Sequence, residues 1–405
     1  MKLFRIIGGV LLLSGIAASV NANNTENPPI ERFVQDLLAS HPQMISAKAK
    51  LDAAKADAMA KEQPLYNPEL EVELGRTTEN TGIVGLSQTF DWSDKAGALA
   101  TIGQKTLLTA SAELKEAELL LQLDLLRSLA AFSYEKKRSK LASESKLLME
   151  RFYEIAIERQ KVGEIAQVEV DLIELARLTA SMRTNESKAS LSSSEQALEY
   201  FTSMPITNWP DMPSTLPAIP VVEDVNQLLL QHPSVKKHEA AIQARESELI
   251  LSQRNQKADP TVGLRAGTND GDNYVGLDFS IPLYVRNSYS SETQASRRRV
   301  VEAESAFDDA LRQSKYTLNS AVIQYRANYN SWLDWQKSGA MTIDRRTFNL
   351  EAMWKAGELG TMEYLIQLRE SLNARSMVLQ TEYQAWLSWF NWLASSGVVS
   401  IPVSN

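Results

Sequence analysis

Side chains that ordinarily carry catalysis or bind metals are sparse in this sequence. The chain has no cysteine, three histidines (His41, His232 and His238) and eleven scattered methionines. Disulfides and thiolate metal sites are therefore excluded. No nucleophile–base arrangement and no glycine-rich phosphate loop stands out. We expect neither an enzyme nor a cofactor nor a resident metal.

Carboxylates are the exception, because several of them recur at a regular spacing. Glu69, Glu71 and Glu73 occupy every second position of a segment whose intervening residues are apolar. This alternation is the two-residue period of a β-strand, so the three acids share one face. In a later segment Asp278 and Arg265 lie opposite an apolar set in the same way. An acidic face of this kind suits a wet passage for cations.

Each of these segments belongs to a predicted β-hairpin, at residues 66–90 and 261–281. Apolar residues on one face and polar residues on the other are typical of a membrane β-barrel with a wet lumen, although a soluble sandwich edge gives the same short alternation. Four strands cannot close a barrel, and lipid does not tolerate open sheet edges. In a membrane, several copies of the chain would have to share one barrel. The apolar set is Leu70, Val72, Leu74, Val84, Leu86, Phe90, Val262, Leu264, Ala266, Val275, Leu277, Phe279 and Ile281.

The hairpins are part of a tandem duplication. The matching pairs are His41 with His232 and Gly85 with Gly276, both 191 residues apart, and Gly163 with Gly357, 194 residues apart. One architectural unit is therefore built twice.

Long helices fill most of each unit. Residues 93–201 and 288–394 contain no proline and predict two long helices each, with breaks at Gly163 and at Gly357–Gly360. The first would run for about 65 residues, on the order of 100 Å. Residues 30–62 predict one more helix. Tryptophans spaced by three residues, at 332, 335, 386, 389 and 392, predict a packing layer between helices.

The predicted organisation begins with a signal peptide, residues 1–22. Lys2 and Arg5 precede an apolar stretch that ends before a small-residue cleavage pattern. A first repeat at 23–203, a proline-rich linker at 204–222, a second repeat at 223–396 and a tail at 397–405 follow. An exported chain without cysteine is not a lipoprotein. Its net charge of −8 makes nucleic acid an unsuitable partner.

The order and duplication of these elements resemble the TolC-like outer membrane factors of tripartite efflux systems, over about residues 30–395. The elements that carry the resemblance are the His-Pro helix starts, Asn67–Leu70, Gly85–Thr89, Ile281–Tyr284, and the two glycine breaks with an acidic residue after each. The Asn-Pro-Glu-Leu and Leu-Ser-Gln elements look most like the CzcC-like branch, which serves heavy-metal cation efflux.

The resemblance implies a mainly α-helical homotrimer that acts as a passive exit duct. Three copies would give four strands each to a shared twelve-stranded β-barrel in the outer-membrane lipid. Their helices would form an α-helical barrel across the periplasm. The implied partners are a periplasmic adaptor protein and an inner-membrane pump of the resistance–nodulation–division type. Gly163 and Gly357 would mark the turns at the periplasmic tip.

The resemblance also implies a gate at this tip. The acidic residue six positions after the second glycine rings the constriction in the family, and here it is Glu363. Three copies would form an anionic ring that favours cations. Glu169 takes the same place in the first half, as a hydrogen-bond or ion-pair partner that stabilises the gate. Family polar residues are replaced by Trp354, Leu359 and Ile366, whose apolar packing is the predicted substitute.

Two other functions stay open at this point. The same fold could export drugs or other organic solutes. Alternatively, a periplasmic coiled-coil adaptor would also contain long helices, but it gives no reason for two equal halves.

Overall fold

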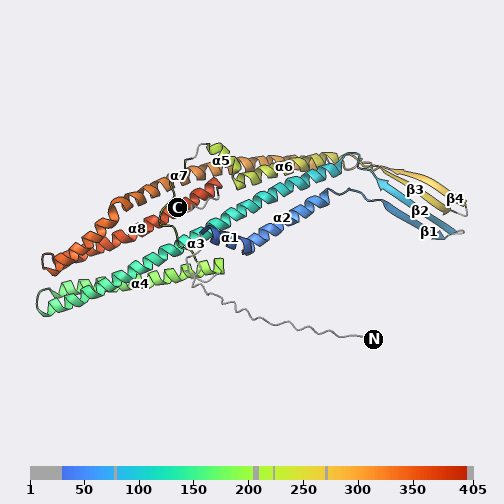
Figure 1. The fold of residues 1–405 in the computed structure, drawn as a ribbon. Helices are drawn as coiled ribbons and strands as arrows, with labels where there is room; N and C mark the ends of the chain where they lie inside the picture. Colours follow the sequence, from blue (N-terminus) through green and yellow to red (C-terminus); the bar gives the residue numbers. More distant parts are fainter. Residues whose placement is uncertain (1–29, 77–79, 204–208, 222–223, 270–271, 399–405) are drawn as a thin grey trace, which may run out of the picture.

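The computed structural model describes residues 30–76, 80–203, 209–221, 224–269 and 272–398. The predicted signal peptide lies outside these residues, as do parts of the predicted linker and most of the predicted tail. The chain forms a long rod with a β-sheet at one end and two helix-to-helix turns at the other (Figure 1).

The first half contains one very long helix with shorter helices along it. The helices are α1 (Ile30–Ser40), α2 (Pro42–Lys61), α3 (Lys95–Lys161) and α4 (Gln167–Thr202). The prediction of a single helix over 30–62 is wrong, because the helix is interrupted at His41 and ends at Lys61. His41 is extended (φ −67°, ψ 132°), and Pro42 starts a new helix because it has no N–H to continue the first. The Nδ1 atom of His41 accepts a hydrogen bond from the Gln43 N–H at 3.2 Å.

The second half repeats this arrangement. Its helices are α5 (Val225–Gln231), α6 (Pro233–Arg254), α7 (Ser290–Lys355) and α8 (Thr361–Ser396). His232 separates α5 from α6 as His41 separates α1 from α2. In each half the second short helix packs along the sheet-side part of the long helix, and the last helix packs along the tip-side part (Figure 1). Helix α6 also contacts α3, which joins the two halves.

The four strands form one antiparallel sheet in the order β1-β2-β3-β4. The two predicted hairpins are β1 (Glu69–Arg76) with β2 (Asn80–Thr89), and β3 (Thr261–Asn269) with β4 (Asp272–Ser280). Strands β2 and β3 pair from Gly82↔Thr268 to Thr89↔Thr261, so the sheet is continuous across the two halves. This agrees with the predicted fold class: mainly helical, duplicated, and with four strands per chain.

The main hydrophobic core lies midway along the rod. Trp332, Trp386, Trp389 and Trp392 are buried there, as the predicted packing layer requires, whereas Trp335 is only partly buried and lies outside this core. The described part of the linker packs on the same core through Trp209. None of the helices in the described ranges is both long and apolar enough to span a membrane.

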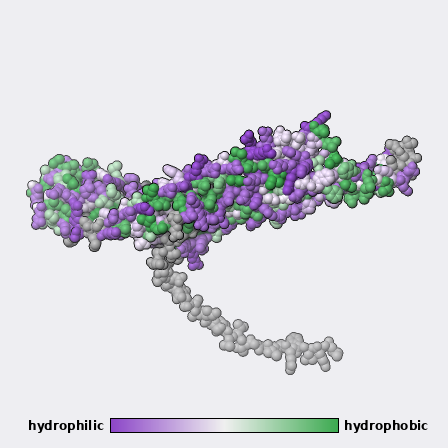
Figure 2. Space-filling model, turned by 90° about the horizontal axis from the view of Figure 1, so that it is seen from above, coloured by the Kyte–Doolittle hydropathy of each residue, from purple (hydrophilic) through white to green (hydrophobic). Residues whose placement is uncertain are grey.

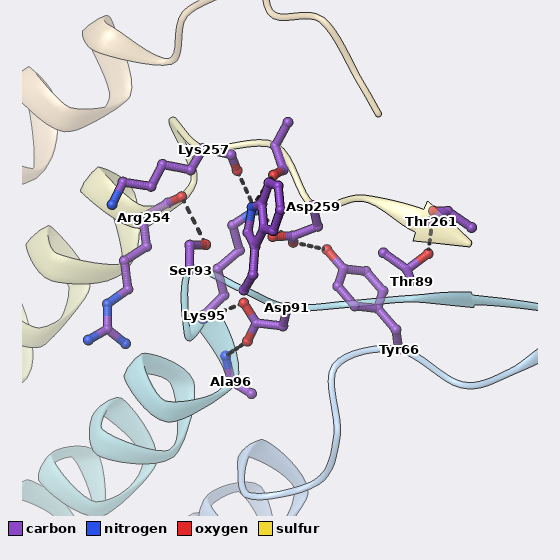
Figure 3. Close-up of polar contacts among 12 residues, drawn as sticks. Tyr66, Thr89, Asp91, Ser93, Lys95, Ala96, Arg254, Lys257, Asp259 and Thr261 are labelled. Carbon is purple, nitrogen blue, oxygen red and sulfur yellow. Dashed lines mark hydrogen bonds and ion pairs between the residues drawn. The ribbon is translucent and has the colours of Figure 1, made fainter. Parts of the chain in front are cut away.

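A buried ion pair fixes the junction between sheet and helices (Figure 3). Lys95, the first residue of α3, bonds through its Nζ to Asp259 Oδ2 at 2.8 Å, and both side chains are more than nine-tenths buried. The same Nζ donates to the Lys257 carbonyl at 2.8 Å. The Tyr66 hydroxyl donates to Asp259 Oδ2 at 2.7 Å. Burial and this bond raise the pKa of Tyr66, so the hydroxyl stays protonated as a donor.

This junction gives the first prediction. Lys95→Met should destabilise the fold by about 3–5 kcal/mol, because it leaves the Asp259 carboxylate buried without its cation. Thermal unfolding followed by circular dichroism measures the loss. Lys55→Met, which breaks an exposed pair with Asp52, should cost less than about 1 kcal/mol. Equal melting temperatures for the two variants would contradict the assignment.

Candidate functional site

The sheet has two chemically different faces, as the alternation predicts. The ladder places Leu70 opposite Leu86, Leu86 opposite Leu264, and Leu264 opposite Leu277. This face is exposed in the single chain: Leu74, Val275 and Leu277 are each about four-fifths accessible (82%, 81% and 78%). In Figure 2 the strand end of the rod carries a hydrophobic band next to the helices.

The opposite face carries Glu69, Glu71, Glu73 and Asp278, as predicted. Two of these acids are paired with the same residue. Arg265 forms ion pairs with both, its Nη2 lying 3.0 Å from Glu71 Oε2 and its Nε 2.8 Å from Asp278 Oδ2. The alternation places Arg265 on this face, but it does not predict a bridge between strands that are not neighbours.

The two turns at the other end have nearly the same backbone. Gly163 and Gly357 have φ values of +78° and +77°, a conformation that L side chains rarely adopt. In each turn the following glutamate N–H bonds back to a carbonyl five residues earlier, Arg159 in the first and Met353 in the second, both at 2.9 Å. Both glycines therefore reverse the chain by the same helix-ending motif.

The two predicted gate acids differ in their surroundings. The Glu169 carboxylate accepts a hydrogen bond from the Ala166 N–H at 3.0 Å, so it caps its own helix, α4. Glu363 holds the equivalent position in α8 and is exposed. Among the described residues no hydrogen bond or ion pair engages its carboxylate. The second acid is thus available to solvent or to another copy of the chain.

An aromatic cluster supports the second turn. Trp354 is buried and stacks on Tyr364, with ring centroids 4.8 Å apart, while Phe152 of α3 meets both rings edge-on. The Arg159 guanidinium lies 4.7 Å from the Trp354 ring centroid. Burial raises the pKa of Tyr364 to about 12, with a smaller contribution from Glu351, so this hydroxyl stays neutral.

The three predicted gate apolar residues do not pack together within the chain. Leu359 is buried in the same cluster as Trp354. Ile366 is 56% exposed and lies beside a groove of about 190 Å³ between α3, α4 and α8. Since Ile366 and Glu363 are three residues apart in α8, they share its exposed face. The cluster therefore holds the turn, and α8 presents Glu363 and Ile366 outward.

Sequence reasoning missed the junction of Tyr66, Lys95 and Asp259. The sequence feature that could have indicated this junction is the repeated proline, because Asp259 precedes Pro260 as Asn67 precedes Pro68. In the described part of the chain, no three histidine or carboxylate side chains are grouped to hold a metal ion.

This chain matches known proteins both in sequence and in structure. The family model for outer membrane efflux proteins matches residues 33–202. The nickel and cobalt resistance protein CnrC of Cupriavidus metallidurans is 25% identical over 348 residues, which cover 79% of this chain and 78% of CnrC. The cobalt-zinc-cadmium resistance protein CzcC of the same organism is 25% identical over 266 residues, 62% of this chain and 63% of CzcC.

A solved structure shows the same fold. The outer-membrane channel OprN superposes with a TM-score of 0.77 at 13% identity, over 91% of this chain and 89% of OprN. The agreement extends across helices and sheet together, although few side chains are shared.

The aromatic cluster yields the second prediction. Trp354→Ala should destabilise the chain by about 3–5 kcal/mol, because it empties a buried aromatic site. The neighbouring turn should loosen, which trypsin cleavage after Lys355 would reveal. The control Ile366→Ala truncates an exposed side chain and should change stability by less than about 0.5 kcal/mol. Unchanged proteolysis in Trp354→Ala would exclude a supporting role for the cluster.

Proposed function

Because the chain is a TolC-like outer membrane efflux protein of the CzcC-like branch, we propose that three copies assemble into one duct that exports heavy-metal cations. The chain itself is an outer membrane efflux channel, a passive duct and not an enzyme. Its long helices make up a large periplasmic portion.

The observation that carries the proposal is the sheet. One face is apolar and exposed, the other is acidic, and the outer edges of β1 and β4 have no strand beside them among the described residues. Lipid satisfies no backbone hydrogen bonds, so these edges must pair with further strands. Three copies would supply twelve strands, with the apolar face towards lipid and the acidic face towards the lumen.

The helices extend this duct into the periplasm. Both ends of each hairpin return to the same end of the sheet, so all eight described helices lie on one side of it (Figure 1). Three copies side by side would enclose a helical tube whose narrow end is formed by the turns at Gly163 and Gly357. A periplasmic adaptor and an inner-membrane pump of the resistance–nodulation–division type would dock there.

Metal cations are the proposed cargo for two reasons. The matched relatives CnrC and CzcC are named for resistance to nickel, cobalt, zinc and cadmium. The polar sheet face and Glu363 would also give the duct negative charge at both ends, which attracts cations. A duct for drugs or organic solutes would have the same fold, and growth experiments separate the two.

The third prediction concerns this cargo. Deletion of the gene in its host should lower tolerance to cobalt or nickel, while tolerance to organic antibiotics should stay unchanged. The wild-type gene on a plasmid should restore growth. If the deletion lowers tolerance to organic compounds alone, the metal-export proposal is wrong and the duct exports drugs or other organic solutes.

The fourth prediction concerns the tip. Three Glu363 carboxylates around one axis would favour cations, so Glu363→Gln should lower the cation-to-anion permeability ratio of single channels by about twofold or more. Glu169→Gln is the matched control, since it removes the same charge from a residue that caps its own helix. The control should leave the ratio unchanged. The Glu363 assignment fails if both variants keep the wild-type ratio.

A further inference from the structure

One arginine crosses the polar face of the sheet at a single level of the ladder. The register places Glu71, Gly85, Arg265 and Gly276 side by side on β1, β2, β3 and β4. Arg265 therefore reaches across β2 to form an ion pair with Glu71 on the far strand, at 3.0 Å. On its other side it forms an ion pair with Asp278 of β4, at 2.8 Å. Its side chain lies against the wall of the sheet.

Glycine makes this path possible. A Cβ on Gly85 would stand 3.1 Å from the Arg265 Cγ and 3.7 Å from the Glu71 Cβ, so a side chain there would crowd the bridge. A Cβ on Gly276 would clash with the Tyr274 ring, which lies over that glycine. Gly85 and Gly276 are the equivalent glycines of the two repeats. Both provide a flat position over which a longer side chain can lie.

The charge at this position differs between the repeats. The residue paired with Gly85 in the first hairpin is Glu71, and the residue paired with Gly276 in the second is Arg265. Among the described strand residues, Arg265 is the one cation on the polar face, because Arg76 falls on the opposite face by alternation. The duplication thus replaces an acid by a base on an otherwise acidic wall.

We propose that Arg265 is a selectivity-determining residue of the strand-lined part of the duct. This proposal rests on the proposed function, in which the polar face of the sheet lines the lumen. Held flat against the wall, the guanidinium cancels part of the field of Glu71 and Asp278, while Glu69 and Glu73 still attract cations. Conduction needs binding that is strong enough to admit an ion and weak enough to release it. Arg265 keeps the wall in this range for a cationic cargo.

Cysteine chemistry tests this locally, without interference from the tip. The chain has no native cysteine, so a single introduced thiol is the one target within this protein. Ser280 is exposed and shares the polar face with Asp278, whereas Leu277 lies on the apolar face. Ser280→Cys in intact cells is treated with a trimethylammonium-ethyl and with a sulfonato-ethyl methanethiosulfonate, and the two rates give a cation-to-anion ratio.

Adding Arg265→Gln to Ser280→Cys should raise this ratio by about threefold, because one positive charge leaves the neighbourhood. Arg265→Lys should restore the ratio, since the charge is kept. Arg76→Gln removes the same charge from the opposite face and should leave the ratio unchanged.

The outcomes separate the two levels of the proposal. If Ser280→Cys is modified but Arg265→Gln does not change the cation-to-anion ratio, the role proposed for Arg265 is wrong. The proposed function as a duct is unaffected by that result. Modification of Leu277→Cys but not of Ser280→Cys would mean that the polar face is not lumenal. That result overturns both this inference and the orientation proposed for the sheet.

Discussion

The backbone groups at the two outer edges of the sheet are the constraint on which the rest of the structure depends. A chain with four strands, an exposed apolar face and edges at β1 and β4 cannot enter lipid alone. In the proposed trimer, closure by further copies would satisfy the edges and give the acidic face an interior. Because each hairpin returns to one side, closure of the sheet would also bring the long helices together around one axis, and the distant turns would then form the proposed constriction.

Each histidine-proline joint contacts the end of the last helix in its own half of the chain. In the second half, the His232 Nε2 lies 2.9 Å from the Ala394 carbonyl near the end of α8, while Nδ1 accepts from the Ser234 N–H. In the first half, the His41 ring lies 5.2 Å from the Phe201 ring near the end of α4. Each joint therefore starts one helix where the last helix of its own half ends. The duplicated histidines are structural, which agrees with the scarcity of metal ligands.

Strand periodicity predicts the two faces of the sheet because alternation is a local property of the backbone. It cannot predict that β2 pairs with β3, because the paired residues are more than 170 positions apart along the chain. The Lys95–Asp259 pair and the Arg265 bridge depend on that same long-range register, so neither can be predicted from the sequence. The error at His41 is of another kind. Proline is tolerated in a first turn, and composition alone does not tell a helix start from a helix interior.

The tips show what duplication fixes and what it leaves free. Gly163 and Gly357 impose one backbone turn in both halves, since the φ value decides it. The side chains of the two turns make different contacts. Glu169 turns its carboxylate back to the Ala166 N–H. The N-cap of α8 is Gly360, which makes no side-chain cap, and the Glu363 carboxylate is exposed. The Trp354 cluster stabilises the second turn from inside the chain, which frees the outer face of α8 from a packing role. The two turns therefore share one backbone geometry but differ in charge, because Glu169 caps its own helix while the Glu363 carboxylate has no partner among the described residues.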